Sequence, residues 1–230
     1  MHLTPKAVVK SIVACCPPQV RDQLLALRKR IQWGSKSNSS HLTYFEDYHS
    51  RMPFILAVKE LLEGLGDAPG TRSLIEFGCS GGNNLRLLRE SSPILVRYCG
   101  LDINPSAIAF AREKFPDATF HIASDGDLNR LAPQLGHFDV FLAAAVLYYL
   151  PHDRAQAVLN LAASLAEYIL VCDDLRCFSH STGKTEGNFF HPFAAMCRRA
   201  GMSVIVPPTR LRDGDNHSYF IARSTMPPTL

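Results

Sequence analysis

Short apolar segments alternate with amphipathic helical segments over most of the chain, and this alternation is the strongest constraint on its fold. Near-continuous apolar runs bounded by turns are typical of strands in a parallel sheet that helices cover on both faces. Five such strands are predicted, over residues 73–78, 96–103, 118–123, 138–145 and 168–174. Helices are predicted over residues 83–91, 105–115, 152–166 and 191–201.

The last two apolar segments, MSVIVP after Gly201 and SYFIARS at 218–224, follow each other without a helical segment between them. Consecutive strands that lack a crossover connection pair antiparallel. The sequence therefore predicts an α/β fold, with a doubly wound, mainly parallel seven-stranded sheet and an antiparallel hairpin at one edge.

The N-terminal part of the chain has a different pattern. Residues 1–33 look helical, the polar run GSKSNSS forms a joint, and residues 41–65 begin aromatic and continue as an amphipathic helix. We expect three regions: a helical extension that serves as a lid (1–70), a main domain (71–224) and a tail (225–230).

Charge, cysteines and hydropathy limit the functional classes. A net charge of +3 over 230 residues is too small to indicate a nucleic-acid partner. The basic run at 27–30 (LRKR) is better explained as a solvated helix end than as a membrane or acidic-partner contact. Seven cysteines without a C-x-x-C pair favour a reducing compartment. The longest apolar run, 141–150, is shorter than the about 20 residues of a membrane span. We therefore expect a cytoplasmic protein with no stable membrane insertion.

A glycine-rich loop, Gly78-Cys79-Ser80-Gly81-Gly82, follows the first predicted strand. Dinucleotide-binding loops have the spacing G-x-G-x-x-G, which lets backbone amides at a helix start bind a pyrophosphate. This loop lacks that spacing, and the carboxylate of Glu76 at the strand end would repel a pyrophosphate. The spacing and the carboxylate thus argue against a phosphate-bearing ligand. A tight turn that binds no ligand is the simpler alternative.

Two segments resemble motifs of the class I S-adenosylmethionine-dependent methyltransferases. EFGCSGG is similar to their first motif, acid-x-Gly-x-Gly-x-Gly, with Ser80 where the middle glycine is usual, and LDINPSAI is similar to their second. The resemblance implies a Rossmann-like domain whose cofactor is S-adenosylmethionine, a nucleoside that carries no phosphate. The cofactor residues that it implies here are Glu76, Gly78, Cys79, Ser80, Gly82, Asp102 and Ile103.

Asp102 ends the second predicted strand, where a carboxylate can accept both ribose hydroxyls of a nucleotide. Ile103 would pack against the adenine. A helix-capping role for Asp102 is a weaker explanation, because Asn104 already precedes the helix start at Pro105.

The resemblance also implies contacts at the ends of the next two strands. An acid after the third strand holds the adenine amino group in such enzymes; Asp125 is favoured here, although the register also allows Ser124 and a turn aspartate explains Asp125 equally well. Ala144 would face the methyl-donor centre. Tyr148 and Tyr149 would border the substrate pocket, although ordinary packing accounts for one of them equally well.

Two regions outside the strands supply further candidates. Tyr44, Tyr48 and Arg51 share one helical face. The resemblance implies that Tyr44 and Arg51 reach the cofactor's carboxylate and that Tyr48 faces the substrate; a solvent-exposed face is an equal alternative. The polar stretch 173–193 offers candidate bases, in the order His180, His191 and Glu186.

No metal is expected, because Cys172, which would have to join Cys177 and His180 as a ligand, lies inside a predicted strand.

We therefore expect methyl transfer to an oxygen or nitrogen of a small molecule, a sugar or natural-product intermediate being favoured. The chain lacks an Asn/Asp-Pro-Pro-Tyr/Phe box and a Pro-Cys pair, which disfavours nucleic acid as substrate. Two alternatives remain: a nicotinamide-dependent oxidoreductase, and a catalytically silent interaction protein with a methyltransferase-like fold. The sequence leaves the oligomeric state open.

Overall fold

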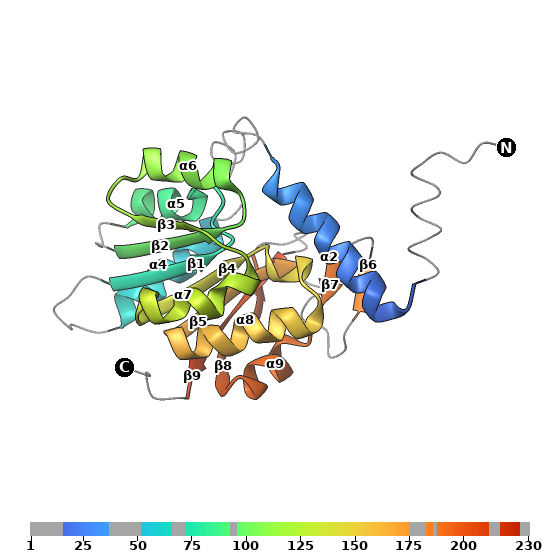
Figure 1. Ribbon diagram of the computed structural model, residues 1–230. Coiled ribbons are helices and arrows are strands. Elements are labelled where there is room, and N and C mark those ends of the chain that lie inside the picture. The colour runs from blue at the N-terminus through green and yellow to red at the C-terminus, as the bar shows by residue number, and fades with distance from the viewer. Residues whose placement is uncertain are drawn as a thin grey trace.

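A seven-stranded sheet forms the centre of the protein. The computed structural model describes residues 16–36, 52–65, 72–92, 96–174, 183–185, 188–211 and 217–225. The strands of the sheet lie in the order β3-β2-β1-β4-β5-β9-β8 (Figure 1). They are β1 (Arg72–Phe77), β2 (Val96–Asp102), β3 (Thr119–Ile122), β4 (Phe138–Ala144), β5 (Ala166–Asp174), β8 (Met202–Arg210) and β9 (His217–Ser224).

The pairing of the strands confirms the predicted fold. The strands β1 to β5 pair parallel, whereas β9 is antiparallel to both β5 and β8. The strand order reverses between β1 and β4, because β1 pairs with β2 on one side and with β4 on the other. In open sheets of this kind, ligands bind at the carboxyl ends of the strands beside this reversal.

Helices cover both faces of the sheet. On one face α4, α5 and α6 share a hydrophobic cluster with alternate residues of the strands, such as Leu74, Val140 and Leu142. On the other face α7, α8 and α9 pack against Ile75 and Phe141. The helices are α2 (Pro18–Gly34), α4 (Met52–Gly64), α5 (Asn83–Ser91), α6 (Pro105–Lys114), α7 (Leu128–Leu135), α8 (His152–Leu165) and α9 (Phe193–Arg199).

The two helices described before β1 are placed differently. Helix α4 buries Phe54, Ile55, Val58 and Leu62 in the same cluster as the sheet, so it belongs to the core of the main domain. Helix α2 lies beyond one end of the strands and buries only Ala26 (Figure 1).

The structure adds elements that the sequence pattern did not predict. Helix α7 contains Pro133, and a proline inside a helical segment removes a backbone hydrogen bond and argues against a helix. This helix forms because Leu128 and Leu131 are buried in the hydrophobic cluster that α7 shares with α8, α9 and that face of the sheet. Strands β6 (Gly183–Thr185) and β7 (Asn188–Phe190) form a separate two-stranded sheet, and η2 (Asp125–Asp127) and η3 (Leu147–Tyr149) are short 3-10 helices.

Among the described residues, no helix combines the length and the apolar character that crossing a membrane requires.

Candidate functional site

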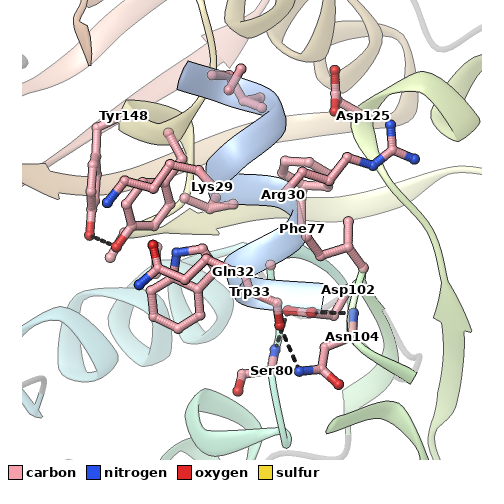
Figure 2. Close-up of a pocket in the computed structure, with 18 of the residues that line it drawn as sticks. Lys29, Arg30, Gln32, Trp33, Phe77, Ser80, Asp102, Asn104, Asp125 and Tyr148 are labelled. Carbon is pink, nitrogen blue, oxygen red and sulfur yellow. Dashed lines mark hydrogen bonds between the residues drawn. The ribbon is translucent and has the colours of Figure 1, made fainter. Parts of the chain in front are cut away.

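A cavity of about 570 Å³ opens at the carboxyl ends of β1, β2 and β4. This volume is within the range of pockets for small molecules and cofactors. Helix α2 crosses the cavity and forms one of its walls (Figure 2). Six of the predicted cofactor residues line it, namely Gly78, Ser80, Asp102, Ile103, Asp125 and Ala144, together with two of the three predicted substrate residues, Tyr148 and Tyr149.

The glycine-rich loop turns sharply after β1. The amides of Gly78 and Cys79 both donate to the carbonyl oxygen of Leu101, at 2.7 and 3.1 Å. Three residues of the loop have positive φ: Gly78 at 81°, Ser80 at 49° and Gly82 at 83°. Left-handed backbone costs an L-residue roughly 1–2 kcal/mol, which is why glycine is usual at the position of Ser80. Ser80 thus keeps the turn that glycine normally makes, at a cost in stability.

Asp102 is held rigidly at the end of β2. Its Oδ2 accepts a hydrogen bond from the amide of Ser80 and its Oδ1 one from the amide of Asn104, both at 2.9 Å (Figure 2). Both carboxylate oxygens are therefore fixed by backbone groups, while the side chain still lines the cavity. An oxygen has more than one lone pair, so the carboxylate can accept further hydrogen bonds from a ligand.

Glu76 lies below the loop and does not line the cavity. It is 1% exposed, and its carboxylate accepts hydrogen bonds from Asn84 Nδ2 at 2.6 Å and from the Tyr98 hydroxyl. Burial and the neighbouring Glu76 carboxylate raise the pKa of Tyr98 well above its usual value, so this phenol keeps its proton. The side chain of Glu76 therefore ties the end of β1 to β2 and α5. Cys79 and Gly82 do not line the cavity either.

Asn83 is a cavity residue that the sequence did not reveal. It is the first residue of α5 and is 5% exposed, and its Oδ1 is buried without a hydrogen-bond partner. A buried polar atom without a partner is costly, so a ligand that donates to Asn83 Oδ1 gains that free energy. An asparagine in the first turn of a helix carries no sequence signal for such an orientation.

Helix α2 is joined to the sheet by contacts between residues far apart in the chain. The side chain of Asn104 donates to the carbonyl oxygens of Trp33 at 2.7 Å and of Lys36 at 3.2 Å. Its Oδ1 also accepts from the amides of Ser106 and Ala107, which confirms its predicted role as the cap of α6. One side chain thus fixes both a helix start and the end of the cavity wall.

The basic run at 27–30 is not simply a solvated helix end. Lys29 and Arg30 line the cavity, whereas Arg28 is exposed and does not. The side chain of Arg30 donates to Ser124 Oγ at 3.2 Å. The structure therefore brings part of the N-terminal extension into the site, through a helix that the sequence did not single out for contacts.

The two candidates after β3 are both engaged by other side chains. Asp125 lines the cavity and forms an ion pair with Arg154 of α8. The hydroxyl of Ser124 donates to Asp127 at 2.6 Å as part of a capping box. Of the two, Asp125 alone reaches the cavity, although its charge is balanced by Arg154.

Tyr148 and Tyr149 form an aromatic wall on η3. Their hydroxyls are hydrogen-bonded to each other at 2.8 Å, and the amide of Tyr148 donates to the buried Asp173 at 3.2 Å. The ring of Trp33 lies 5.4 Å from that of Tyr149, centroid to centroid. Both tyrosines therefore face the cavity, and the aromatic wall continues onto α2.

His191, the second candidate base, is not among the residues that line the cavity. It is 0% exposed, and its Nε2 donates to the carbonyl oxygen of Leu147 at 3.1 Å. Burial lowers the pKa of His191 to about 4. The other candidate bases, His180 and Glu186, and the lid residues Tyr44, Tyr48 and Arg51 lie outside the described residues.

The buried His191 makes the stability depend on pH. Its folded-state pKa lies below the unfolded value of about 6.5, so the unfolded chain binds more protons as the pH falls. Between pH 7.5 and 5 we expect a loss of about 2 kcal/mol that His191→Gln does not show. Urea denaturation of both proteins over this pH range measures their free energies of unfolding. In the difference between the two proteins, the contributions of all other titrating groups cancel. Parallel profiles of the two proteins would contradict the burial of a neutral imidazole.

Comparison with known proteins identifies the central part of the chain. The sequence model of a methyltransferase domain matches residues 75–167. This region is a class I methyltransferase domain. The match begins within β1 and continues past β4, so it contains the glycine-rich loop, Asp102 and the Tyr148–Tyr149 wall, which confirms the resemblance seen in the two motifs.

Curated relatives of the methyltransferase domain cover only part of each chain. A trans-aconitate 2-methyltransferase of Methylobacterium nodulans is 37% identical over 93 residues, 40% of this chain and 34% of that protein. A protein of the same name from Variovorax paradoxus is 33% identical over 98 residues, 43% of this chain and 36% of that protein. The matches thus span about a third of the length of these relatives.

Solved structures share the fold of the methyltransferase domain at low sequence identity. A methyltransferase from Clostridium acetobutylicum has a TM-score of 0.59 at 8% identity, over 81% of this chain and 98% of that chain. The magnesium protoporphyrin IX methyltransferase of Synechocystis, solved with bound S-adenosylmethionine, has a TM-score of 0.55 at 18% identity, over 76% of this chain and 80% of that chain.

Proposed function

We propose that the protein binds S-adenosylmethionine and transfers its methyl group to an oxygen or nitrogen atom of a small molecule. The observation that carries this proposal is the placement of Asp102. Its carboxylate lines the cavity at the end of β2, and two backbone amides hold it in place. A carboxylate at this position suits the two hydroxyls of a ribose.

The rest of the cavity fits a nucleoside without phosphate. Ser80 and Gly78 keep the loop close to the cavity, and Ile103 offers an apolar contact beside Asp102. The orphaned Asn83 Oδ1 accepts a hydrogen bond from a ligand donor, such as the ammonium of the cofactor's amino acid end. These residues would hold the cofactor.

The chain's own contribution is to position the partners and keep water out. When bound, S-adenosylmethionine supplies a methyl group activated by a positively charged sulfur. Ala144 at the end of β4 and the Tyr148–Tyr149 wall border the space in which an acceptor would lie. Helix α2 forms one wall of the cavity, and alignment of two reactants in one site supplies much of the rate of a transfer.

The identity of the acceptor belongs to this proposal. The curated relatives are named for trans-aconitate, a small tricarboxylate, and their matched region is the methyltransferase domain. Small carboxylic acids therefore join sugars and natural-product intermediates as candidate acceptors. Any of the three is consistent with a cavity of about 570 Å³.

Calorimetric titration with S-adenosylhomocysteine and with NAD tests the proposal. We expect binding of S-adenosylhomocysteine and transfer of a labelled methyl group from S-adenosylmethionine to a member of an acceptor panel. Tight NAD binding without S-adenosylhomocysteine binding would favour an oxidoreductase. Cofactor binding without transfer to any acceptor would favour a catalytically silent interaction protein.

A further inference from the structure

The cavity has a surplus of positive charge on the side formed by α2. Lys29 and Arg30 of α2 line it, together with Lys36, which lies two residues beyond the end of this helix. Of the two lining aspartates, Asp125 is paired with Arg154, whereas Asp102 lies at the end of β2. Among the described residues, four cationic side chains (those three and Arg154) line the cavity, against these two carboxylates.

Two of these three cations have defined neighbours elsewhere in the wall. Arg30 donates to Ser124, which places it toward the end of β3. The ammonium of Lys36 lies 3.4 Å from the centre of the Trp33 ring. Lys29 occupies a different position: its ammonium lies 5.0 Å from the centre of the Tyr149 ring, and Figure 2 shows it beside Tyr148 and away from Asp102.

Lys29 lies in a region of positive potential. Among the residues that the structure describes, no carboxylate lies within ion-pair distance of its ammonium. Partial burial, together with the nearby charges of Arg28 and Lys36, lowers the pKa of Lys29. An anion bound beside Lys29 would raise the pKa of its ammonium group again, because it would balance the positive charges and stabilise the protonated amine.

We propose that Lys29 binds an anionic group of the methyl acceptor, a carboxylate or a phosphate, beside the paired hydroxyls of Tyr148 and Tyr149. This assignment rests on the proposed function, because Tyr148 and Tyr149 border the acceptor space only if the cofactor lies along Asp102. The cation–π contact with Tyr149 holds the ammonium in place before the acceptor arrives. Lys29 is then a specificity-determining residue that selects acidic acceptors over neutral ones.

Binding of matched acidic and neutral probes tests this assignment. The probes are trans-aconitate against its trimethyl ester, and glucose 6-phosphate against glucose, each titrated calorimetrically with and without saturating S-adenosylhomocysteine. The variants are Lys29→Met, which removes the charge, and Lys29→Arg, which keeps it. Arg28→Gln is the matched control, because it removes one positive charge from the same helix at an exposed position outside the cavity.

We expect at least one acidic probe to bind and its neutral counterpart to bind at least about tenfold more weakly, as for the loss of a hydrogen bond to a charged group. Lys29→Met should weaken the acidic probe by a similar factor, and Lys29→Arg should restore most of the affinity. Arg28→Gln should weaken it clearly less than Lys29→Met, because Arg28 acts on Lys29 from outside the cavity. Which acid binds decides between carboxylate and phosphate.

Three results would overturn the role of Lys29: no binding of either acid, equal binding of the acid and its neutral counterpart, or equal weakening by Lys29→Met and Arg28→Gln. The proposed function fails separately, through absence of S-adenosylhomocysteine binding by the unaltered protein. In that case the titrations without S-adenosylhomocysteine still decide whether Lys29 binds an anion.

Discussion

Replacement of Asp102 by asparagine is expected to weaken the binding of S-adenosylhomocysteine about 100-fold or more. The carboxylate would accept hydrogen bonds from two ribose hydroxyls, and a hydrogen bond to a charged group contributes about 1.5–3 kcal/mol. Asparagine has no charge and one acceptor oxygen in place of two. Calorimetric titration of the variant and the unaltered protein measures the change directly.

The Asp102 experiment needs a control for folding, because the same carboxylate accepts from the amides of Ser80 and Asn104. Asp117→Asn is a suitable control, since Asp117 is an exposed aspartate whose charge pairs with Arg89 far from the cavity. Its affinity for S-adenosylhomocysteine should equal that of the unaltered protein. A loss of less than about fivefold in a folded Asp102→Asn variant would remove Asp102 from the cofactor site.

The local part of the site could be predicted from the sequence. The strand that ends in Asp102 and the loop that contains Ser80 are each short and continuous, and the alternation of strands and helices places both ends at the same edge of the sheet. The positive φ of Ser80 shows that a serine can make the turn for which glycine is usual. The departure from the motif therefore affects stability more than the path of the chain.

Contacts between distant segments could not be predicted in this way. The hydrogen bond from Asn104 to Trp33 joins residues 71 apart in the chain, and nothing in the pattern of α2 indicates which face meets the cavity. The basic run therefore looked like a solvated helix end, although Lys29 is a cavity residue. Helix α7 was missed for a related reason: its interior Pro133 opposes a helix locally, and burial of its leucines in the core outweighs that preference.

The site thus combines two sources of specificity. The loop after β1 and Asp102 belong to the methyltransferase domain that the relatives share. Lys29 and Trp33 come from α2, which precedes that matched region and lines the same cavity. If Lys29 binds the acceptor as proposed, a change in α2 would alter the choice of acceptor and leave the proposed cofactor contacts of the sheet intact.

Replacement of Gly78 by alanine is expected to destabilise the protein by about 2–5 kcal/mol. The φ of this residue is 81°, and a left-handed backbone costs an L-residue roughly 1–2 kcal/mol. An added Cβ would also lie 2.8 Å from both Cβ and Cγ2 of Val146. Overpacking of this kind typically costs a further 1–3 kcal/mol. Urea denaturation at neutral pH measures the sum as a fall in the free energy of unfolding.

Ser80→Ala is the matched control for Gly78→Ala. It ends with the same residue in the same loop, but the backbone of Ser80 already carries a Cβ at a φ of 49°. The free energy of unfolding should therefore change by less than about 0.5 kcal/mol, as for substitutions away from packed contacts. If Gly78→Ala cost no more than Ser80→Ala, the loop would have room beside Val146, and close packing against that residue would not be what fixes the turn.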